Sequence, residues 1–212
     1  MKSFVERHRG VWSRQIFQSA ILGAVLFLGA IVVNYFATRY VTARASAPVT
    51  DIILSNVRVY DVDGIIVYGA LALALFASII TLYHPKRIPF VLKSVGLFIV
   101  IRSIFISLTH LGPFSPGVMI EPTRILNFLG ITTTADLFFS GHTGMPFLLA
   151  LIYWDKKPLR WIFLATSVLF AVSVLLGHLH YSIDVFAAFF ITYSIFKLAQ
   201  FLFPRDWQRS RE

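Results

Sequence analysis

The sequence predicts an all-α membrane protein with six transmembrane helices and both termini in the cytoplasm. Three observations predict this fold. Hydrophobic residues make up 57% of the chain and charged residues only 14%, whereas a soluble domain carries roughly a quarter charged residues. The apolar residues gather in runs as long as a membrane-crossing helix, which needs about 20 residues. Lysine and arginine gather in the segments between alternate runs.

The first span is expected at 16–37, an uncharged apolar run that follows a basic segment at 1–15. This run is longer than the apolar core of a signal peptide, which has about 7–15 residues, so we expect an uncleaved helix. Residues 38–63 are mixed in character and contain a proline and several aspartates. They are expected to form a loop with a short surface helix at 52–59.

The last two spans follow from a length argument. Residues 161–203 are apolar almost without pause, and one helix of that length would extend about 65 Å at 1.5 Å per residue. That is about twice the bilayer core, so the chain must turn back at its polar break, near 177–181. The spans after the first are expected at 65–83, 90–111, 136–154, 161–177 and 181–203.

The lysines and arginines orient these spans. Twelve lie in the N-terminal segment, the turns at 84–89 and 155–160 and the C-terminal tail, whereas four lie in the loops at 38–63 and 112–136. Cytoplasmic segments are the ones enriched in lysine and arginine, so both long loops and the turn near 177–180 should be extracytoplasmic. The net charge of +9 then reflects topology. No basic stripe with interleaved aromatics indicates nucleic-acid binding.

The chain contains no cysteine. This excludes disulfides, cysteine-ligated zinc, iron–sulfur clusters and c-type haem attachment. We expect no cofactor.

His180 and Asp184 are four residues apart at the start of the sixth span, which places them on one helix face. A carboxylate bound to one ring nitrogen of a histidine leaves the other nitrogen free to act as a nucleophile or base. The alternative is a polar pair that satisfies itself at a helix start. An acid within a membrane span costs roughly 2.5–3.5 kcal/mol, which favours a functional role for Asp184.

Ser140, Gly141, His142 and Thr143 stand at the expected start of the fourth span. A helix N-terminus binds anions, and phosphate above all, through its backbone N–H groups. Gly141 would let the backbone approach a ligand, and His142 could donate a proton to a leaving oxygen. The alternative is an ordinary N-cap, with His142 facing the headgroups. Asp136 could orient His142 or cap the helix earlier.

Arg102 lies inside the third span, where a buried arginine indicates function by default. It could hold a phosphate, or it could snorkel or pair with a neighbour. His178 is expected to belong to the turn, and the role of His110 stays open. Two histidines, an acid and an anion-binding helix end suit phosphoryl transfer. The cluster lacks the carboxylates of a magnesium site, so we expect no metal, with a histidine-bound zinc as the less favoured alternative.

The two motifs resemble those of the sphingomyelin synthase-like branch of the type 2 phosphatidic acid phosphatase superfamily. Residues 136–143 match its Asp-x-x-x-Ser-Gly-His-Thr motif, and residues 178–185 match His-x-His-Tyr-[Ser/Thr]-x-Asp-Val. An arginine in the third span, here Arg102, and a Pro-x-x-Asp segment, here 48–51, also fit. The resemblance covers about 50–204.

The resemblance implies one integral-membrane lipid phosphatase or phosphotransferase domain over 1–212, with a cytoplasmic tail at 1–15. It also implies a phosphohistidine mechanism, in which His180 is the nucleophile, Asp184 orients it and His142 is the acid and base. The expected substrate-binding residues are Ser140, Gly141, Thr143, Arg102 and Asp136.

Three departures from the superfamily pattern concern the phosphate-holding cations and the fourth span. The first motif, with its lysine and Arg-Pro, is missing, and Ser173-Val174 replaces the Ser-Arg pair that begins the third. Arg102 is the candidate replacement cation. Thr134-Ala135 replaces the Cys-Gly before the motif aspartate.

The expected function is transfer of a phosphoryl group or phospho-headgroup from a lipid, through a phosphohistidine, at the extracytoplasmic face of a membrane. From the small size and short loops we expect a bacterial inner membrane. The acceptor could be ceramide, diacylglycerol or, as in a phospholipase C, water. One alternative is a lipid phosphate phosphatase that releases inorganic phosphate. A more remote one is a non-enzymatic small transporter, although no internal repeat is evident. Headgroup, acyl chains and oligomeric state stay open.

Overall fold

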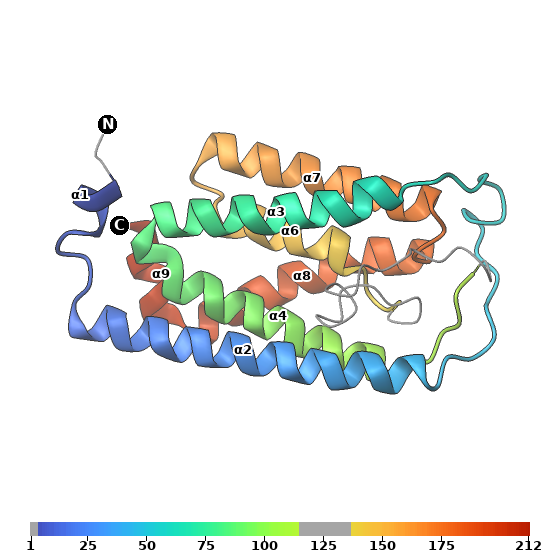
Figure 1. Ribbon diagram of the computed structural model, residues 1–212, viewed down its shortest axis with the longest axis horizontal. Coiled ribbons are helices and arrows are strands. Elements are labelled where there is room, and N and C mark those ends of the chain that lie inside the picture. Colours follow the sequence, from blue (N-terminus) through green and yellow to red (C-terminus); the bar gives the residue numbers. More distant parts are fainter. Residues whose placement is uncertain (1–3, 115–136) are drawn as a thin grey trace.

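The computed structural model describes residues 4–114 and 137–212, and every regular element in these ranges is a helix (Figure 1). The predicted all-α class is confirmed there. In chain order the elements are α1 (Phe4–His8), α2 (Arg14–Thr42), α3 (Asp63–Tyr83), η1 (Pro85–Arg87), α4 (Ile88–Leu108), α6 (Gly141–Ile152), α7 (Lys157–Leu176), α8 (Ser182–Leu202) and α9 (Pro204–Arg211).

Five stretches of helix in the described ranges are long and apolar enough to cross a membrane: α2, α3, η1 with α4, α7 and α8. The span expected at 136–154 appears as α6, which has only 12 residues. At 1.5 Å per residue α6 is about 18 Å long, well short of a hydrocarbon core of about 30 Å. The six expected spans therefore correspond to five full-length helices and one short one.

Two boundaries differ from the prediction near the first loop. Helix α2 continues to Thr42 because the apolar run is followed by residues that still pack, with Val41 buried against Ile106. The surface helix expected at 52–59 is replaced by turns. The side chain of Asp51 accepts hydrogen bonds from the N–H groups of Ile53 and Leu54, which bends the chain locally.

The C-terminal segment also differs, since it forms the helix α9 and not a polar tail. Asp206 of α9 pairs with Lys93 of α4, with 2.6 Å between Nζ and Oδ2, and both side chains are buried. Ser19 of α2 donates a hydrogen bond to the same carboxylate. A buried charge is tolerated only when it is paired, so this cluster fastens α9 across α2 and α4.

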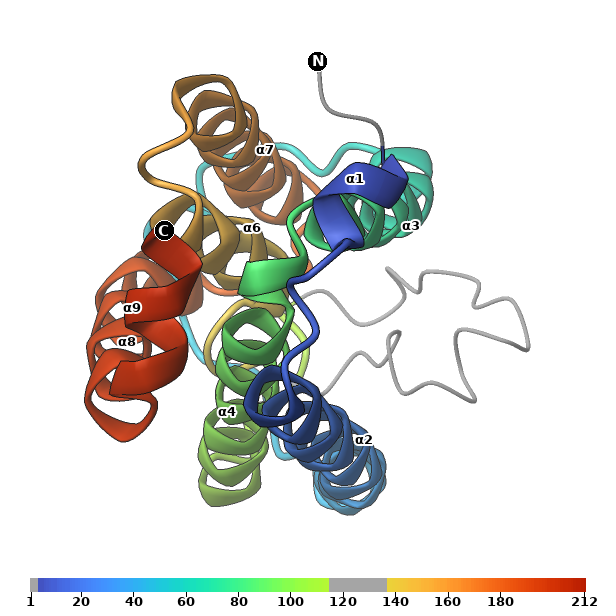
Figure 2. The same cartoon turned by 90° about the vertical axis from the view of Figure 1, so that its left-hand side faces the viewer.

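Helix α6 lies at the centre of the bundle, in contact with α3, α4, α7 and α8 (Figure 2). Its last turns supply much of the main core, where residues 148–153 are buried among α4, α7 and α8. The long helices α2 and α4 pack along each other on one side. Because α6 is short and central, its N-terminal end is enclosed by longer helices, and this end carries the first histidine motif.

Candidate functional site

The N-terminal ends of α6 and α8 lie side by side. The N–H of Ser140, which precedes α6, donates to the C=O of Asp184 in the first turn of α8, at 3.1 Å. The rings of His142 and His180 are 6.4 Å apart between centroids and inclined at 64°. Two motifs that are far apart in the sequence therefore meet in one place, with the turn that joins α7 to α8 beside them.

His180 is held through its Nδ1 atom, which lies 2.8 Å from the carbonyl oxygen of Leu137. A carbonyl can only accept a hydrogen bond, so Nδ1 must carry the proton. In the neutral ring the lone pair is then on Nε2, the atom that could attack phosphorus. The His180 side chain is 6% exposed, so the ring is fixed inside the protein. Sequence reasoning missed this partner, because a backbone carbonyl has no signature in the sequence.

The Leu137 carbonyl is placed by a small apolar cluster. Leu54, Leu137 and Tyr181 are all buried against one another, with Leu111, Phe114 and Leu175 packed on the outside. These residues come from the first long loop, the segment before α6 and the start of α8. The cluster therefore sets where the acceptor of the His180 hydrogen bond lies.

Asp184 lies next to His180 but is not its closest partner. Its Oδ2 atom is 3.6 Å from Nδ1 of His180, beyond hydrogen-bond length, and 2.9 Å from the N–H of Tyr181, from which it accepts. Asp184 thus caps its own helix in a capping box. It is fully buried, and its Oδ1 atom has no hydrogen-bond partner among the residues described. The arrangement leaves a carboxylate close enough to stabilise a positive His180 ring.

Ser140 is the N-cap of α6. Its Oγ accepts from the N–H of Thr143 at 3.3 Å and from the Thr143 hydroxyl at 3.2 Å. Both side chains are fully buried, and Ser167 of α7 donates to the C=O of Thr143. The N-cap alternative therefore describes Ser140 correctly. The helix itself offers no acceptor to its first N–H groups, and this helix end carries His142.

Arg102 of α4 reaches the same helix end. Its Nε donates to the C=O of Phe139 at 3.0 Å, and the side chain is mostly buried. It also lies against Gly141, where an added Cβ would come within 3.1 Å of Nε and 3.4 Å of Cζ. Gly141 therefore allows the close approach of a guanidinium to the start of α6. The structure places Arg102 at the histidine site, and not at a membrane surface.

Asp51 ties the first long loop to α8. Its Oδ2 atom accepts from the N–H of Ser182 at 2.7 Å and from the Ser182 hydroxyl at 2.8 Å. Its Oδ1 atom accepts from the N–H groups of Ile53 and Leu54. Burial raises the pKa of Asp51, but these hydrogen bonds outweigh it and hold the pKa below its ordinary value. Ser182 lies between His180 and Asp184, so Asp51 fixes the backbone that carries both.

The turn before α8 is fixed by two further side chains. His178, with φ of 52°, donates from Nε2 to the C=O of Val57 at 3.0 Å. The Tyr181 hydroxyl donates to the C=O of Gly112 and accepts from the N–H of Val49. His178 is therefore part of the turn, as the sequence predicts.

The two remaining candidates are His110 and Asp136. His110 packs edge-on against Tyr40 of α2, with 5.5 Å between ring centroids. Asp136, the first residue of the predicted motif, lies outside the described residues. Within the described ranges no three histidine, aspartate or glutamate side chains gather in a way that could hold a metal ion.

Comparisons with known proteins match the region that carries both histidine motifs. Residues 133–201 match the family model of the PAP2 superfamily C-terminal region. Sphingomyelin synthase-related protein 1 of Homo sapiens is 38% identical over 92 residues, and its Mus musculus counterpart is 40% identical over 76. An uncharacterized protein of Methanocaldococcus jannaschii is 34% identical over 85 residues. No solved structure matches.

These matches cover part of each chain. They span 41%, 34% and 40% of this chain, and 22%, 16% and 36% of the human, mouse and archaeal relatives. The family-model match contains both histidine motifs. The resemblance predicted from those motifs is therefore confirmed.

Proposed function

We propose, from the similarity of residues 133–201 to the sphingomyelin synthase-like branch of the PAP2 superfamily, that this chain is a membrane enzyme of lipid phosphate chemistry. It transfers a phosphoryl group or a phospho-headgroup from a lipid through a covalent intermediate on His180. The observation that carries the proposal is the pair of rings, buried His180 and partly exposed His142, at the meeting of two helix N-termini.

In the first step Nε2 of His180 attacks the phosphorus of the lipid. The bond from phosphorus to the diacylglycerol oxygen breaks, and protonated His142 gives its proton to that oxygen. Diacylglycerol leaves, and the phosphoryl or phospho-headgroup stays on His180. The 6.4 Å between the two ring centroids leaves a reacting group between the rings within reach of both.

The negative oxygens on phosphorus need positive partners as the reaction proceeds. Arg102 provides a guanidinium beside Gly141, and the start of α6 provides N–H groups and the positive end of the helix dipole. In a buried site such fixed groups stabilise developing charge more strongly than water does. The Asp184 carboxylate, 3.6 Å from Nδ1, stabilises the positive charge of the substituted His180 ring.

In the second step the neutral His142 takes a proton from an acceptor hydroxyl. The acceptor oxygen attacks phosphorus, the bond from phosphorus to Nε2 breaks, and His180 returns to its starting form. The burial of His180 and Arg102 limits water at the site, which favours a lipid alcohol such as ceramide or diacylglycerol as acceptor. Hydrolysis by water is the alternative outcome.

The site belongs on the extracytoplasmic side. The start of α2 and the end of α8 lie at one end of the bundle (Figure 1), with most of the lysines and arginines of the short connections. That end is assigned to the cytoplasm of a bacterial inner membrane. The histidine pair lies toward the opposite end, where the first long loop contacts the start of α8.

The experiment uses purified protein in detergent with three substrate sets: phosphatidic acid alone, phosphatidylcholine or phosphatidylethanolamine alone, and each phospholipid with ceramide. Mass spectrometry follows inorganic phosphate, the phospho-headgroup and new lipid. His180→Ala should abolish every product, whereas His110→Ala, the same change outside the site, should keep turnover. A ceramide product identifies a transferase, and inorganic phosphate from phosphatidic acid alone identifies a phosphatase. A folded protein without any product would refute catalysis on these lipids.

A further inference from the structure

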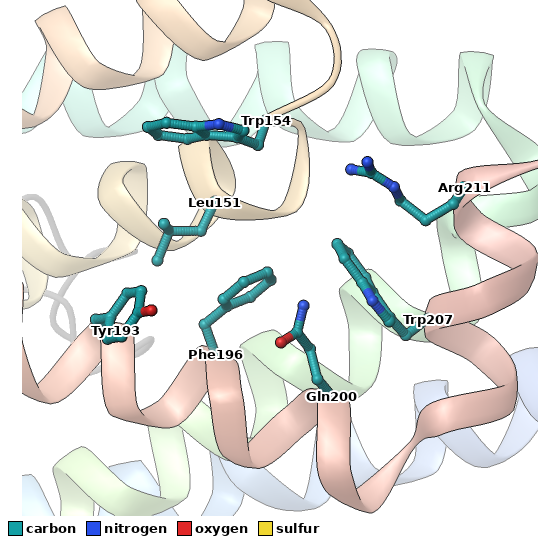
Figure 3. A pocket seen from close by; sticks show the side chains of 7 residues that line it. All are labelled: Leu151, Trp154, Tyr193, Phe196, Gln200, Trp207 and Arg211. Atoms are coloured by element: carbon teal, nitrogen blue, oxygen red, sulfur yellow. The ribbon is translucent and has the colours of Figure 1, made fainter.

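A pocket of about 400 Å³ lies at the end of the bundle opposite the proposed active site, between α6, α8 and α9 (Figure 3). Its volume falls within the range of small-molecule sites, about 300–1,000 Å³. Aromatic side chains form most of its wall, and two polar side chains, one from α8 and one from α9, complete it. The residues that line it are Leu151, Trp154, Tyr193, Phe196, Gln200, Trp207 and Arg211.

The walls of this pocket are apolar inside and aromatic at the rim. Leu151 and Phe196 are buried and form the floor, whereas Trp154 and Tyr193 are 47% and 49% exposed. The pocket is built from the ends of α6 and α8, where an apolar helix meets a basic segment. Half-exposed tryptophan and tyrosine at such a level are typical of the membrane interface. The pocket therefore opens toward lipid.

The wall on the α9 side is firmly held. Asp206, in the first turn of α9, forms the buried ion pair with Lys93. Trp207, the next residue, packs against Phe90 and Phe196, with ring centroids 5.0 and 5.3 Å apart. The pocket is thus part of the packed structure.

One arginine, Arg211, lines the pocket, and a second, Arg160, stacks on one of the rings that line it. The Arg211 guanidinium lies 5.3 Å from the Trp207 ring centroid, and that of Arg160 lies 4.7 Å from the Trp154 ring centroid. The neighbouring acid, Asp155, lies 3.4 Å from Arg211, but it is already bound by Arg87 at 2.6 Å. A guanidinium has five N–H donors, so Arg211 can bind a further anion.

We propose that this pocket binds one anionic phospholipid from the leaflet at the cytoplasmic end. The lipid phosphate lies on Arg211, and an acyl chain lies along Phe196 and Leu151. The Arg211 guanidinium favours an anionic headgroup, and the apolar floor favours a lipid over a soluble anion. The bound lipid bridges α6, α8 and α9, so it stabilises the fold and takes no part in the reaction at the other end.

The test measures lipid binding directly. Purified protein in a neutral detergent is titrated with phosphatidylglycerol or with phosphatidylcholine, and native mass spectrometry counts bound lipids while thermal unfolding reports stabilisation. Arg211→Gln should weaken phosphatidylglycerol binding about tenfold, since it removes a charge-assisted phosphate contact. Arg209→Gln is the matched control: Arg209 lies on the same helix but bonds to Gln15 at 2.6 Å. It should change binding by less than about twofold.

A second variant tests the apolar part. Gln200→Trp places a large ring in the pocket and should remove the tightest bound lipid while leaving the charge unchanged. Lipid in the proposed active site would respond to changes at Arg102 and not to these variants, so failure here is separate from failure of the catalytic proposal. Three results would overturn the lipid site: equal effects of the two arginine variants, equal binding of phosphatidylcholine, or full stabilisation by inorganic phosphate alone.

Discussion

Replacing Asp51 with asparagine should impair turnover although Asp51 lies outside both histidine motifs. The side chains have the same shape, and the amide oxygen of asparagine can still accept from Ile53 and Leu54. The amide nitrogen, however, would face the N–H of Ser182, which now donates to Oδ2 at 2.7 Å. Two charge-assisted hydrogen bonds are lost, each worth about 1.5–3 kcal/mol.

Part of that loss is recovered, because the Ser182 hydroxyl can turn and accept from the new amide. We therefore expect Asp51→Asn to destabilise the fold by about 2–4 kcal/mol, and to let the start of α8 shift. A displacement of about 1 Å in a catalytic group can cost about a hundredfold in rate. The expected result is a fall in kcat of about ten- to a hundredfold with a smaller change in KM, because Asp51 positions His180 and does not touch substrate.

The assay measures kcat, KM and thermal unfolding for Asp51→Asn beside Asp61→Asn, a control in the same loop. Asp61 is exposed and accepts from the N–H of Asp63, so its replacement should be nearly neutral. If Asp51→Asn kept both kcat and stability at the level of Asp61→Asn, the positioning argument would be wrong.

The pH dependence of stability is a second test of Asp51. The pKa of Asp51 is lowered, so its stabilisation is present above the ordinary aspartate pKa and is lost as pH falls through the folded-state value. In Asp51→Asn the free energy of unfolding should therefore fall less as the pH is lowered than it does in the unchanged protein.

Gly141→Ala should lower kcat/KM about tenfold without loss of helix, because a Cβ within 3.1 Å of Nε would force the Arg102 guanidinium to shift by a few tenths of an ångström. Circular dichroism and kinetics would separate the two effects. Unchanged kinetics would contradict the role of Arg102. Lys93→Met should destabilise the protein by about 3–5 kcal/mol, because it leaves Asp206 buried without its cation. The double variant with Asp206→Leu should recover much of this stability in thermal unfolding. If it does not, the lost ion pair is not the cause. Asp155 has a pKa lowered by its arginine partner against the opposing effect of burial. Its stabilisation is therefore lost only as pH falls below the ordinary aspartate pKa. Asp155→Asn should make the free energy of unfolding depend less on pH in that acid range.

The spans could be predicted because hydropathy acts over whole helices. The run at 16–37 and the length of 161–203 led to helices close to α2, α7 and α8. The meeting of His142 and His180 followed from the alternation of apolar runs, which places the starts of the fourth and sixth spans at one face.

The unpredicted features depend on contacts between distant segments. The bond from Ser182 to Asp51 and the pair of Lys93 with Asp206 join residues more than 100 positions apart. No local periodicity indicates such pairs. The short length of α6 could not be predicted either, because hydropathy does not distinguish apolar residues that precede a helix from apolar residues within it.

The hydrogen bond from His180 to the Leu137 carbonyl has a consequence for mutagenesis. Its acceptor belongs to the main chain, so no substitution at Leu137 can delete the carbonyl, and an alanine scan of the neighbouring residues would not identify it. What can move it is the packing of Leu54, Leu137 and Tyr181. Enlarging or shrinking one of these buried side chains should move the Leu137 carbonyl away from Nδ1 of His180, so packing residues that do not touch the substrate set the orientation of the nucleophile.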